Sequence, residues 1–314
     1  MAICGLSFSH SHPPVYELAK KYNVPVIVPF SSPAAVFAPI ENDCREVFST
    51  GPVMHPKFHY HGYAEALLVS KLFPKDYTVA STSYATPGGR ILSSWGAQWC
   101  EKFGYKVVYH EDVPPGTVDL TTWAEKVAKA NPDVYLSQLG GELLIPFWSS
   151  LEKVGWTKSL LIASFMNEGD FVKAVDGLMK PRNNIYWFGN YAPSFADIPE
   201  YDEIRKAMKK FRHKYTLSAN HARGWTTARL IEAALSRVGW PCDRQALFNT
   251  LEKTDLDTKG LTGGKIRFSQ TDHYGTAWGR AYQWEPGKRT MLPATDWIKI
   301  EPNMIAKEYS KWGK

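Results

Sequence analysis

Short apolar runs that predict β-strands alternate with amphipathic stretches that predict helices over about the first two thirds of the chain. Residues 2–4 and 24–28 form two such runs, and between them Val15, Leu18 and Tyr22 recur at the spacing of a helix face. Further strands are predicted at 78–81, 107–109, 134–136 and 160–163, and further helices are marked by Leu67, Trp99 and Leu144. This alternation predicts βαβ units, and therefore an α/β fold with parallel sheets.

Capping and breaking residues predict where individual helices begin and end. Thr122 and Glu125 stand three residues apart and predict a capping box at a helix start. Pro132 follows Asn131 and predicts that this helix stops there, because a residue before proline avoids the helical conformation. A later helix is predicted at 244–252.

The C-terminal part of the chain has a different pattern and predicts β-structure. Apolar and polar residues alternate through 277–284, and the residues 285–288 have the composition of a tight turn. A second short strand is predicted at 265–268, after a glycine-containing turn. The chain is therefore expected to end in antiparallel strands rather than in further βα units.

Length and composition place the chain among ordinary globular proteins. A length of 314 residues is enough for about two domains. Hydrophobic residues make up 44% and charged residues 22%, as in most soluble domains. The formal net charge is +6, and the basic residues appear scattered along the sequence, so that neither a nucleic-acid face nor a polybasic membrane patch is predicted.

Cysteine spacing excludes two common kinds of site. The four cysteines, Cys4, Cys44, Cys100 and Cys242, form no C-x-x-C pair, so no zinc ribbon and no thioredoxin motif is predicted. Cys4 lies in an apolar strand pattern and Cys100 on an apolar helix face, and both are expected to be buried thiols. The sequence leaves open whether any pair forms a disulfide.

Targeting signals are not predicted in the chain as given. No apolar stretch approaches the roughly 20 residues that a transmembrane helix needs. Residues 1–5 contain no basic segment followed by an apolar one, which is the pattern of a signal peptide.

Four segments, in one order along the chain, resemble the motifs of a known family. They are Tyr22–Pro33, Gly116–Leu120 followed by Asn131–Val134, Leu151–Trp156, and Leu261–Phe268 followed by a Gly-Lys turn. In sequence and spacing they are similar to the type I periplasmic binding proteins of branched-chain amino-acid and amide ABC transporters. The matched stretch runs from the first residues to about residue 295.

This resemblance implies two Rossmann-like α/β lobes with parallel sheets. Lobe I is expected to comprise 1–48 and 189–264, and lobe II 49–188 and 265–314. In the family, two further βα units, roughly 70 residues by unit size, and a secretion signal precede the segment matched by 2–5. Lobe I is therefore expected to be incomplete at its N-terminus. Three explanations for the missing part are open: the chain is a fragment of a longer protein, its start codon was misplaced, or it is a truncated relative of the family.

The resemblance also implies the function. The chain is expected to be the substrate-binding protein of an ABC transporter, which captures a small amino acid, amide or carboxylate between two lobes and then docks on an inner-membrane permease. The implied location is the periplasm, and the implied state is a monomer with no cofactor. A ligand-sensing regulatory module of the same fold and a truncated relative that binds nothing are the alternatives.

Candidate ligand-binding residues in lobe I follow the first two predicted strands. In open α/β folds ligands bind at the carboxyl ends of parallel strands. Ser9 follows the first strand and precedes a helix start, where free backbone N–H groups favour an anion. Phe30, Ser31 and Ser32 follow the second strand, where the family uses a carbonyl and a hydroxyl. These serines could instead serve only as a helix cap and a turn.

Lobe II and one helix of lobe I supply the remaining candidates. By position in the resemblance, Tyr84, Gly140 and Ser164 follow three successive strands of lobe II, and Trp225 occupies a place where the family often has an aromatic ring on the ligand. Trp225 could equally be part of the core. Family members that bind α-amino acids carry an acid near Ser164, and its absence here leaves carboxylates, amides and aromatic acids open.

No metal site and no enzyme activity are predicted. His55, His59 and His61 are close in sequence, but the side chains of His59 and His61 would point to different sides of a helix. The chain contains no G-x-S-x-G, no H-E-x-x-H and no G-x-G-x-x-G motif.

Overall fold

The computed structural model describes residues 2–4, 12–29, 45–51, 60–162, 168–176, 178, 181–275, 278–300 and 302–311. The chain divides into two compact units, and each unit is assembled from segments that are distant in sequence. Unit 1 consists of Met1–Tyr60, Asn190–Trp278 and Lys299–Lys314, and unit 2 consists of His61–Gly189 and Gly279–Ile298.

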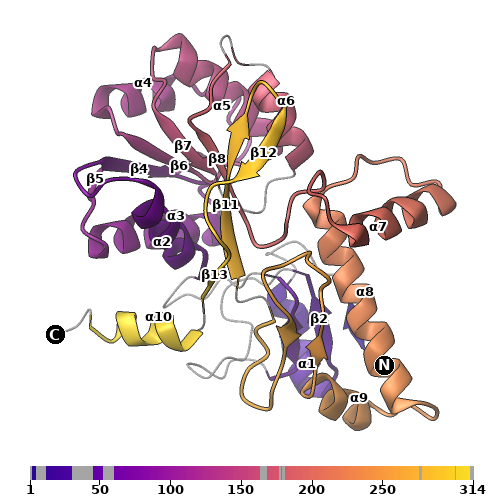
Figure 1. Ribbon diagram of the computed structural model, residues 1–314. Coiled ribbons are helices and arrows are strands. Elements are labelled where there is room, and N and C mark those ends of the chain that lie inside the picture. The colour runs from indigo at the N-terminus through magenta and orange to yellow at the C-terminus, as the bar shows by residue number, and fades with distance from the viewer. Residues whose placement is uncertain are drawn as a thin grey trace. The chain divides into compact units, whose positions relative to one another are not determined.

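Unit 2 is built on one mixed sheet whose centre is parallel (Figure 1). Its strand order is β12-β11-β8-β7-β6-β4-β5, and β13 pairs with β11. The parallel strands are β4 (Thr78–Thr82), β5 (Lys106–His110), β6 (Val134–Ser137), β7 (Ser159–Ile162) and β8 (Ile185–Gly189). The antiparallel additions are β11 (Trp278–Glu285), β12 (Thr290–Pro293) and β13 (Ile298–Lys299), so the β-rich tail predicted from sequence is confirmed.

Helices cover both faces of this sheet. On one side lie α2 (Tyr60–Leu72) and α3 (Pro87–Lys102), and on the other side lie α4 (Thr121–Ala130), α5 (Gly141–Lys153) and α6 (Glu168–Asp176) (Figure 1). Parallel strands require such crossover helices, because the chain must return to the same edge of the sheet before the next strand begins. The predicted α/β class is therefore confirmed in this unit.

Two glycines allow α2 and α3 to cross closely. A Cβ atom on Gly62 of α2 would lie 2.7 Å from the backbone nitrogen of Gly96 on α3, which is closer than two atoms can approach. The side chains around this crossing are large, and Tyr63 packs edge-on against Trp99 at 4.8 Å between ring centroids. The crossing brings α2 near enough to the sheet for its polar residues to reach the strand ends.

Unit 1 contains a smaller parallel sheet and a group of helices. The sheet has the order β1-β2-β3, formed by β1 (Ile3–Cys4), β2 (Val26–Val28) and β3 (Val47–Ser49). Unit 1 also contains a separate antiparallel pair, formed by β9 (Asp255–Leu256) and β10 (Ile266–Arg267). Its helices are α1 (His12–Tyr22), α7 (Pro199–Lys210), α8 (Ala219–Val238), α9 (Arg244–Leu251) and α10 (Pro302–Tyr309).

One apolar cluster holds unit 1 together. Phe48 on β3 contacts Phe248 of α9 and Phe268 edge-on at 5.3 and 5.2 Å, and it stacks on His273 at 3.9 Å. Leu230 of α8 belongs to the same cluster. Burial holds the pKa of His273 at about 4, so this imidazole is neutral and packs as an apolar ring at neutral pH.

The observed units differ from the predicted lobes in three segments and at Gly189, which belongs to unit 2 although the sequence assigned it to lobe I. Residues 49–60 belong to unit 1, as do 265–278 and 299–314, whereas the sequence assigned all three segments to lobe II. The physical reason is visible in the pairing. Ile266 of β10 faces Leu256 of β9 and belongs to the Phe48 cluster, and Ser49 bridges to Tyr274. The boundaries between the two units are therefore set by tertiary contacts, which the local sequence does not encode.

Two local predictions are wrong. Helix α4 begins one residue before Thr122, and its N-cap, Leu120, makes no side-chain cap hydrogen bond. The Asp119 carboxylate accepts the Thr121 N–H at 2.9 Å instead, so the predicted capping box does not form. Cys4 is exposed rather than buried, because β1 stands at the end of its sheet and, among the described strands, pairs with β2 alone. Cys100 is buried as predicted, and Asn131 ends α4 in the left-handed conformation.

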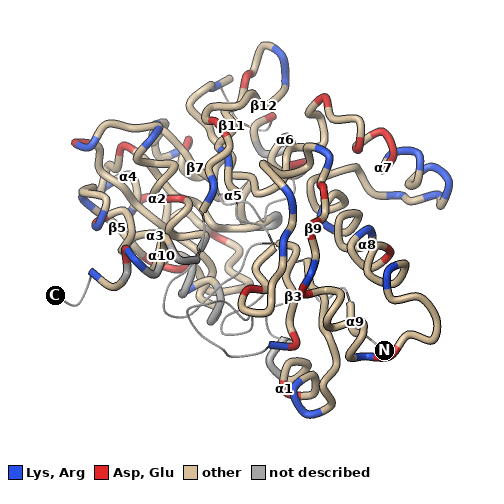
Figure 2. Tube along the Cα trace, turned by 60° about the horizontal axis from the view of Figure 1, so that its bottom comes forward, with Lys and Arg blue, Asp and Glu red and all other residues tan. Residues whose placement is uncertain are grey.

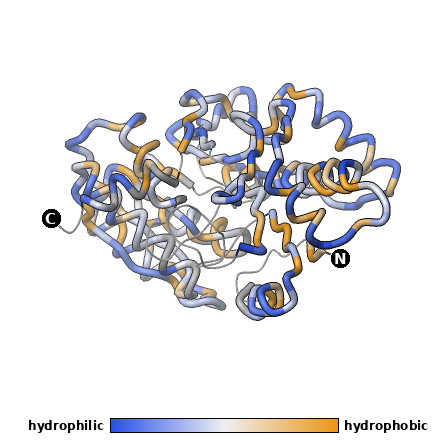
Figure 3. Tube along the Cα trace, turned by 90° about the horizontal axis from the view of Figure 1, so that it is seen from below, coloured by the Kyte–Doolittle hydropathy of each residue, from blue (hydrophilic) through white to orange (hydrophobic). Residues whose placement is uncertain are grey.

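Most of the outer trace of the described chain is polar, although large apolar side chains such as Trp240, Val118 and Phe211 are exposed. Hydrophilic residues dominate the outer loops, and hydrophobic residues lie mainly on interior strands and inward helix faces (Figure 3). Within the described ranges, no helix has both the length and the hydrophobicity needed to cross a membrane.

Candidate functional site

Three of the eight predicted ligand-binding residues lie in described parts of the chain. They are Tyr84 and Gly140 in unit 2 and Trp225 in unit 1. The other five, Ser9, Phe30, Ser31, Ser32 and Ser164, lie outside the described residues, and their role stays a prediction.

The structure brings Tyr84 and Gly140 together. Tyr84 follows β4 and Gly140 follows β6, and the two strands are neighbours with parallel register, so their carboxyl ends share one edge of the sheet. The Tyr84 hydroxyl accepts a hydrogen bond from the Gly140 N–H at 3.1 Å and donates one to the Gly140 carbonyl at 3.1 Å. We call this pair the Tyr84–Gly140 clasp. It ties together the loops after β4 and β6.

The loop that carries Tyr84 is held in place by an acidic side chain. Asp112 accepts hydrogen bonds from the Ser83 N–H at 3.1 Å and from the Ser93 hydroxyl at 2.7 Å. Thr86 then caps α3, because its hydroxyl accepts the Gly89 N–H at 3.1 Å. The clasp therefore rests on a loop that is fixed at both ends.

Buried polar side chains gather at the carboxyl ends of the same two strands. Thr82 and Ser137 are register partners on β4 and β6, and both side chains are fully buried. Gln138 is also buried and donates its amide N–H to Glu65 on α2 at 2.5 Å. Buried polar groups carry a desolvation penalty unless they are paired, so a polar strand end inside an apolar sheet points to a site.

Glu65 is the most strongly perturbed acid beneath this edge. Its side chain is 1% exposed, and burial raises its pKa to about 8, against the smaller opposing effect of the Gln138 hydrogen bond. At pH 7 the carboxyl group is therefore mostly neutral and can itself donate a hydrogen bond. Glu65 was not singled out from the sequence, although Ser81–Ser83 and Ser137–Gln138 stand out as polar ends of predicted apolar strands.

Trp225 belongs to unit 1, whereas Tyr84 and Gly140 belong to unit 2. It belongs to α8, and its indole N–H donates to the carboxylate of Glu200 on α7 at 2.7 Å. Arg229 and Lys259 also approach Glu200, at 2.9 and 3.5 Å. The ring is therefore held against α7 by a buried acid with two basic neighbours, and its predicted contact with a ligand stays a prediction.

A second polar cluster, on the buried face of α8, was not predicted from sequence. The guanidinium of Arg223 lies over the ring of Tyr191 at 5.8 Å and is 6% exposed. Tyr191 donates its hydroxyl to the Thr50 carbonyl at 2.9 Å, and the Thr50 hydroxyl meets that of Thr227 at 2.7 Å. Nothing in the local pattern around Arg223 distinguishes it from a surface arginine, so only the packing of α8 reveals it.

Metal binding finds no support in the described ranges, where no three His, Cys, Asp or Glu side chains come together. His61, one of the histidines considered from sequence, is buried on α2 and packs edge-on against Phe188 at 5.6 Å. His55 and His59 lie outside the described residues.

Comparison with family models matches residues 2–289 to the family described as periplasmic binding protein. This match covers most of the chain. The chain belongs to the periplasmic binding protein family. Its role is accordingly to bind a solute, and the family is one of binding proteins rather than of enzymes.

Solved structures of ABC transporter proteins, among them solute-binding proteins, have the same fold at low sequence identity. A branched-chain amino-acid ABC transporter protein from Thermus thermophilus with bound valine gives a TM-score of 0.78 at 14% identity, over 99% of this chain and 80% of that one. A solute-binding protein from R. palustris in complex with 4-hydroxybenzoate gives 0.75 at 16%, over 96% and 79%.

A third similar structure is a fatty acid ABC transporter substrate-binding protein from Thermomonospora curvata. It gives a TM-score of 0.75 at 16% identity, over 98% of this chain and 76% of that one. Comparison with curated protein sequences gave no match. At these identities the structural likeness establishes the fold of this chain and leaves its ligand undetermined.

Proposed function

We propose that this periplasmic binding protein is the substrate-binding protein of an ABC transporter and that it captures a small carboxylate or amide. The observation that supports this most directly is the Tyr84–Gly140 clasp, which joins two loops at the carboxyl ends of neighbouring parallel strands. Ligands of open α/β sheets bind at this edge. The bound solutes named for similar structures, valine and 4-hydroxybenzoate, are both small carboxylates.

The chemistry of this edge suits a small polar ligand. Gly140 also serves as the N-cap of α5, and no side chain caps that helix. Free N–H groups at a helix start favour an anionic or carbonyl oxygen. The clasp holds Gly140, so the direction of these N–H groups is set before the ligand arrives, which lowers the entropy lost on binding.

The remaining parts of the proposal rest on family membership. The ligand-bound protein docks on a membrane permease, acts in the periplasm and is a monomer. The site is completed by Ser9, Phe30, Ser31, Ser32 and Ser164. The ligand is bound between two lobes, as in the family that the sequence resembles. A ligand shifts the balance between open and closed forms only by its differential affinity for the closed form.

The test is a ligand screen followed by one substitution and a matched control. The purified chain is screened by thermal shift against amino acids, amides and aromatic acids, since a ligand that binds the native state alone raises the melting temperature. Dissociation constants of the hits are then measured for Tyr84→Phe. Loss of the hydroxyl that orders Gly140 is expected to weaken binding about tenfold, the size of one hydrogen bond.

The control is Tyr109→Phe, which removes a hydroxyl that donates to Glu111 at 3.0 Å elsewhere in unit 2. It is expected to leave the affinity unchanged. Equal affinities in both variants would place the ligand away from the clasp. A screen without hits would favour the alternative that this chain is a truncated relative that binds no ligand. Stimulation of a cognate transporter ATPase by the liganded protein separates transport from sensing.

A further inference from the structure

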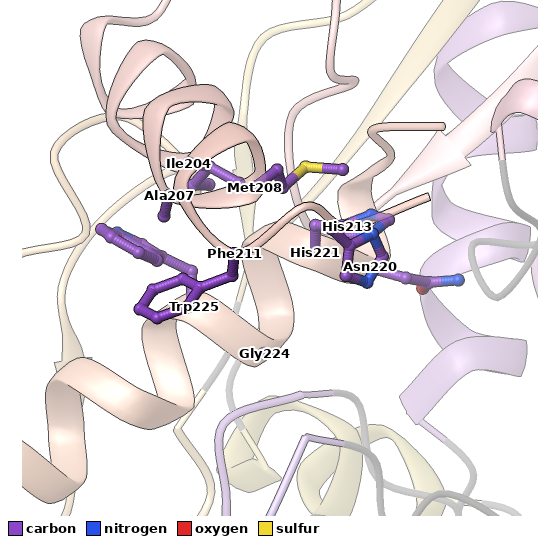
Figure 4. Close-up of a pocket in the computed structure, with 9 residues that line it drawn as sticks. All are labelled: Ile204, Ala207, Met208, Phe211, His213, Asn220, His221, Gly224 and Trp225. Carbon is purple, nitrogen blue, oxygen red and sulfur yellow. The ribbon is translucent and has the colours of Figure 1, made fainter. Parts of the chain in front are cut away.

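A pocket of about 410 Å³ lies in unit 1 between α7 and α8 (Figure 4). It is formed by these two helices and by the segment that joins them, all within unit 1. Its volume falls within the range of small-molecule sites. It is lined by Ile204, Ala207, Met208, Phe211, His213, Asn220, His221, Gly224 and Trp225.

The apolar wall of the pocket is formed by rings that face the same space. Figure 4 shows Trp225 and Phe211 beside Ile204 and Ala207 at one end, with His213, His221 and Asn220 at the other. The Trp225 indole is fixed by its hydrogen bond to Glu200. The wall is therefore preformed for an apolar body.

Gly224, an exposed residue of α8, leaves open space in the lining of the pocket. A Cβ atom at this position would find no other atom within 4 Å. Glycine inside a helix lowers helix stability relative to alanine, and no neighbour here requires its small size. The missing side chain leaves room that no other part of the described unit fills.

Two histidines at the other end present hydrogen-bond donors. The Nδ1 atom of His221 accepts the Ser218 N–H at 3.1 Å, and that of His213 accepts the Tyr215 N–H at 3.3 Å. A neutral imidazole that accepts at Nδ1 carries its proton at Nε2. Burial and the nearby His213 hold the pKa of His221 below its ordinary value, so the neutral form prevails. The ring centroids are 5.1 Å apart.

The rim of the pocket is basic. Lys209, Lys210, Arg212 and Lys214 are exposed around Phe211, and none of them forms an ion pair with a described residue. Figure 2 shows this concentration of basic residues at the end of α7 and beyond it, whereas the start of α7 is acidic. Basic residues are scattered along the sequence as a whole, but these four gather beside an apolar pocket.

We propose that this pocket is a second small-molecule site, which binds a small apolar carboxylate. The ring or short aliphatic chain of the ligand lies against Trp225 and Phe211, and its carboxylate accepts hydrogen bonds from Nε2 of His213 and His221. The basic rim attracts the anion, and the uncharged walls select the apolar body. This site does not depend on the proposed function of the Tyr84–Gly140 clasp.

The experiment follows the two histidines directly in the full chain. Sodium benzoate and sodium octanoate are titrated while the imidazole nitrogen signals are recorded by NMR, with His213→Phe and His221→Gln used to assign them. Benzoate is expected to shift the Nε2 signals of both residues with one dissociation constant. Benzyl alcohol, which has the same ring without the charge, is expected to bind at least tenfold more weakly.

Two matched leucine substitutions on α8 test the location. Gly224→Leu fills the pocket and is expected to weaken benzoate binding at these histidines at least tenfold. Ala228→Leu adds the same side chain at an exposed position one turn away, outside the lining, and is expected to leave binding unchanged. Melting temperatures of both variants show whether each is folded.

A second variant keeps the test decisive if Gly224→Leu fails to fold. His213→Phe keeps a ring and removes one donor, so it is expected to reduce the preference for benzoate over benzyl alcohol. The proposal is overturned if benzoate and octanoate leave both histidine signals unchanged up to about 10 mM, or if Gly224→Leu and Ala228→Leu bind equally. Loss of the clasp in Tyr84→Phe is expected to leave this binding intact, which separates the two sites.

Discussion

Replacing the buried acid Glu65 with glutamine is expected to remove a large pH dependence from the stability of unit 2. Glu65 lies on α2, accepts a hydrogen bond at 2.5 Å from Gln138, the residue that follows β6, and is 1% exposed. A Cβ atom added to Gly96 of α3 would lie 3.3 Å from the carboxylate of Glu65, so no water-sized space separates α2 from α3 at this point. Glutamine has the same shape and can keep the contact, but it never ionises.

The magnitude follows from the two pKa values of the group. In the unfolded chain a glutamate titrates near its ordinary value of 4.5, whereas burial raises the pKa of Glu65 to about 8 in the native state. Between these pH values the native state keeps a proton that the unfolded chain has lost. The free energy of unfolding therefore falls as pH rises through this window and becomes level above it. The loss between pH 5 and pH 8 is about 3.5 kcal/mol.

The assay compares wild type with Glu65→Gln by urea unfolding at pH 5, 6, 7 and 8. The stability advantage of the variant is expected to grow by about 3.5 kcal/mol from the first pH to the last. Hydrogen exchange of the peptides that contain α2 and β6 assigns the effect to unit 2. Glu101→Gln, at an exposed position on α3, is the matched control and is expected to show no such growth. A difference that stays constant with pH would refute the assignment of a raised pKa to Glu65.

Three other substitutions test local features of the fold. Gly62→Ala places a Cβ 2.7 Å from the backbone of Gly96, and thermal unfolding is expected to show a destabilisation of about 2–3 kcal/mol. Thr86→Ala removes the α3 cap and is expected to lower stability by about 1 kcal/mol in urea unfolding. The native pKa of His273, about 4, lies below its ordinary 6.5, so the unfolded chain binds a proton more readily than the native state between these pH values. The free energy of unfolding is therefore expected to fall by about 2.6 kcal/mol as pH drops from 6.5 to 4, and His273→Gln should flatten that decline in acid titrations followed by circular dichroism.

Local sequence was sufficient for most helices and strands. The apolar runs at 134–136 and 160–163 became β6 and β7, and the predicted helix at 244–252 became α9 at Arg244–Leu251. These predictions succeed because periodicity and helix-ending residues act within a few positions of the chain. The capping box at Thr122 failed because the helix starts at Thr121, with Leu120 as its N-cap, which is two residues earlier than the motif requires.

The candidate site was predictable only in part. Tyr84 and Gly140 were chosen because each follows a strand, and parallel pairing of β4 with β6 then brought them within one hydrogen bond. Glu65 was not found, since a glutamate on an amphipathic helix looks the same in sequence whether it faces water or the sheet. Its burial depends on the glycine crossing of α2 and α3, which couples residues more than 30 positions apart.

The sequence by itself determined the α/β class, the order of the elements and membership of the periplasmic binding protein family, because these depend on short-range periodicity and on motifs that are continuous in the chain. Only the tertiary structure decided where the two units divide and which polar groups are buried. Those outcomes depend on contacts such as that of Phe48 with Phe268, and on the exclusion of water around Glu65. Both arise from packing between segments that lie far apart in the chain.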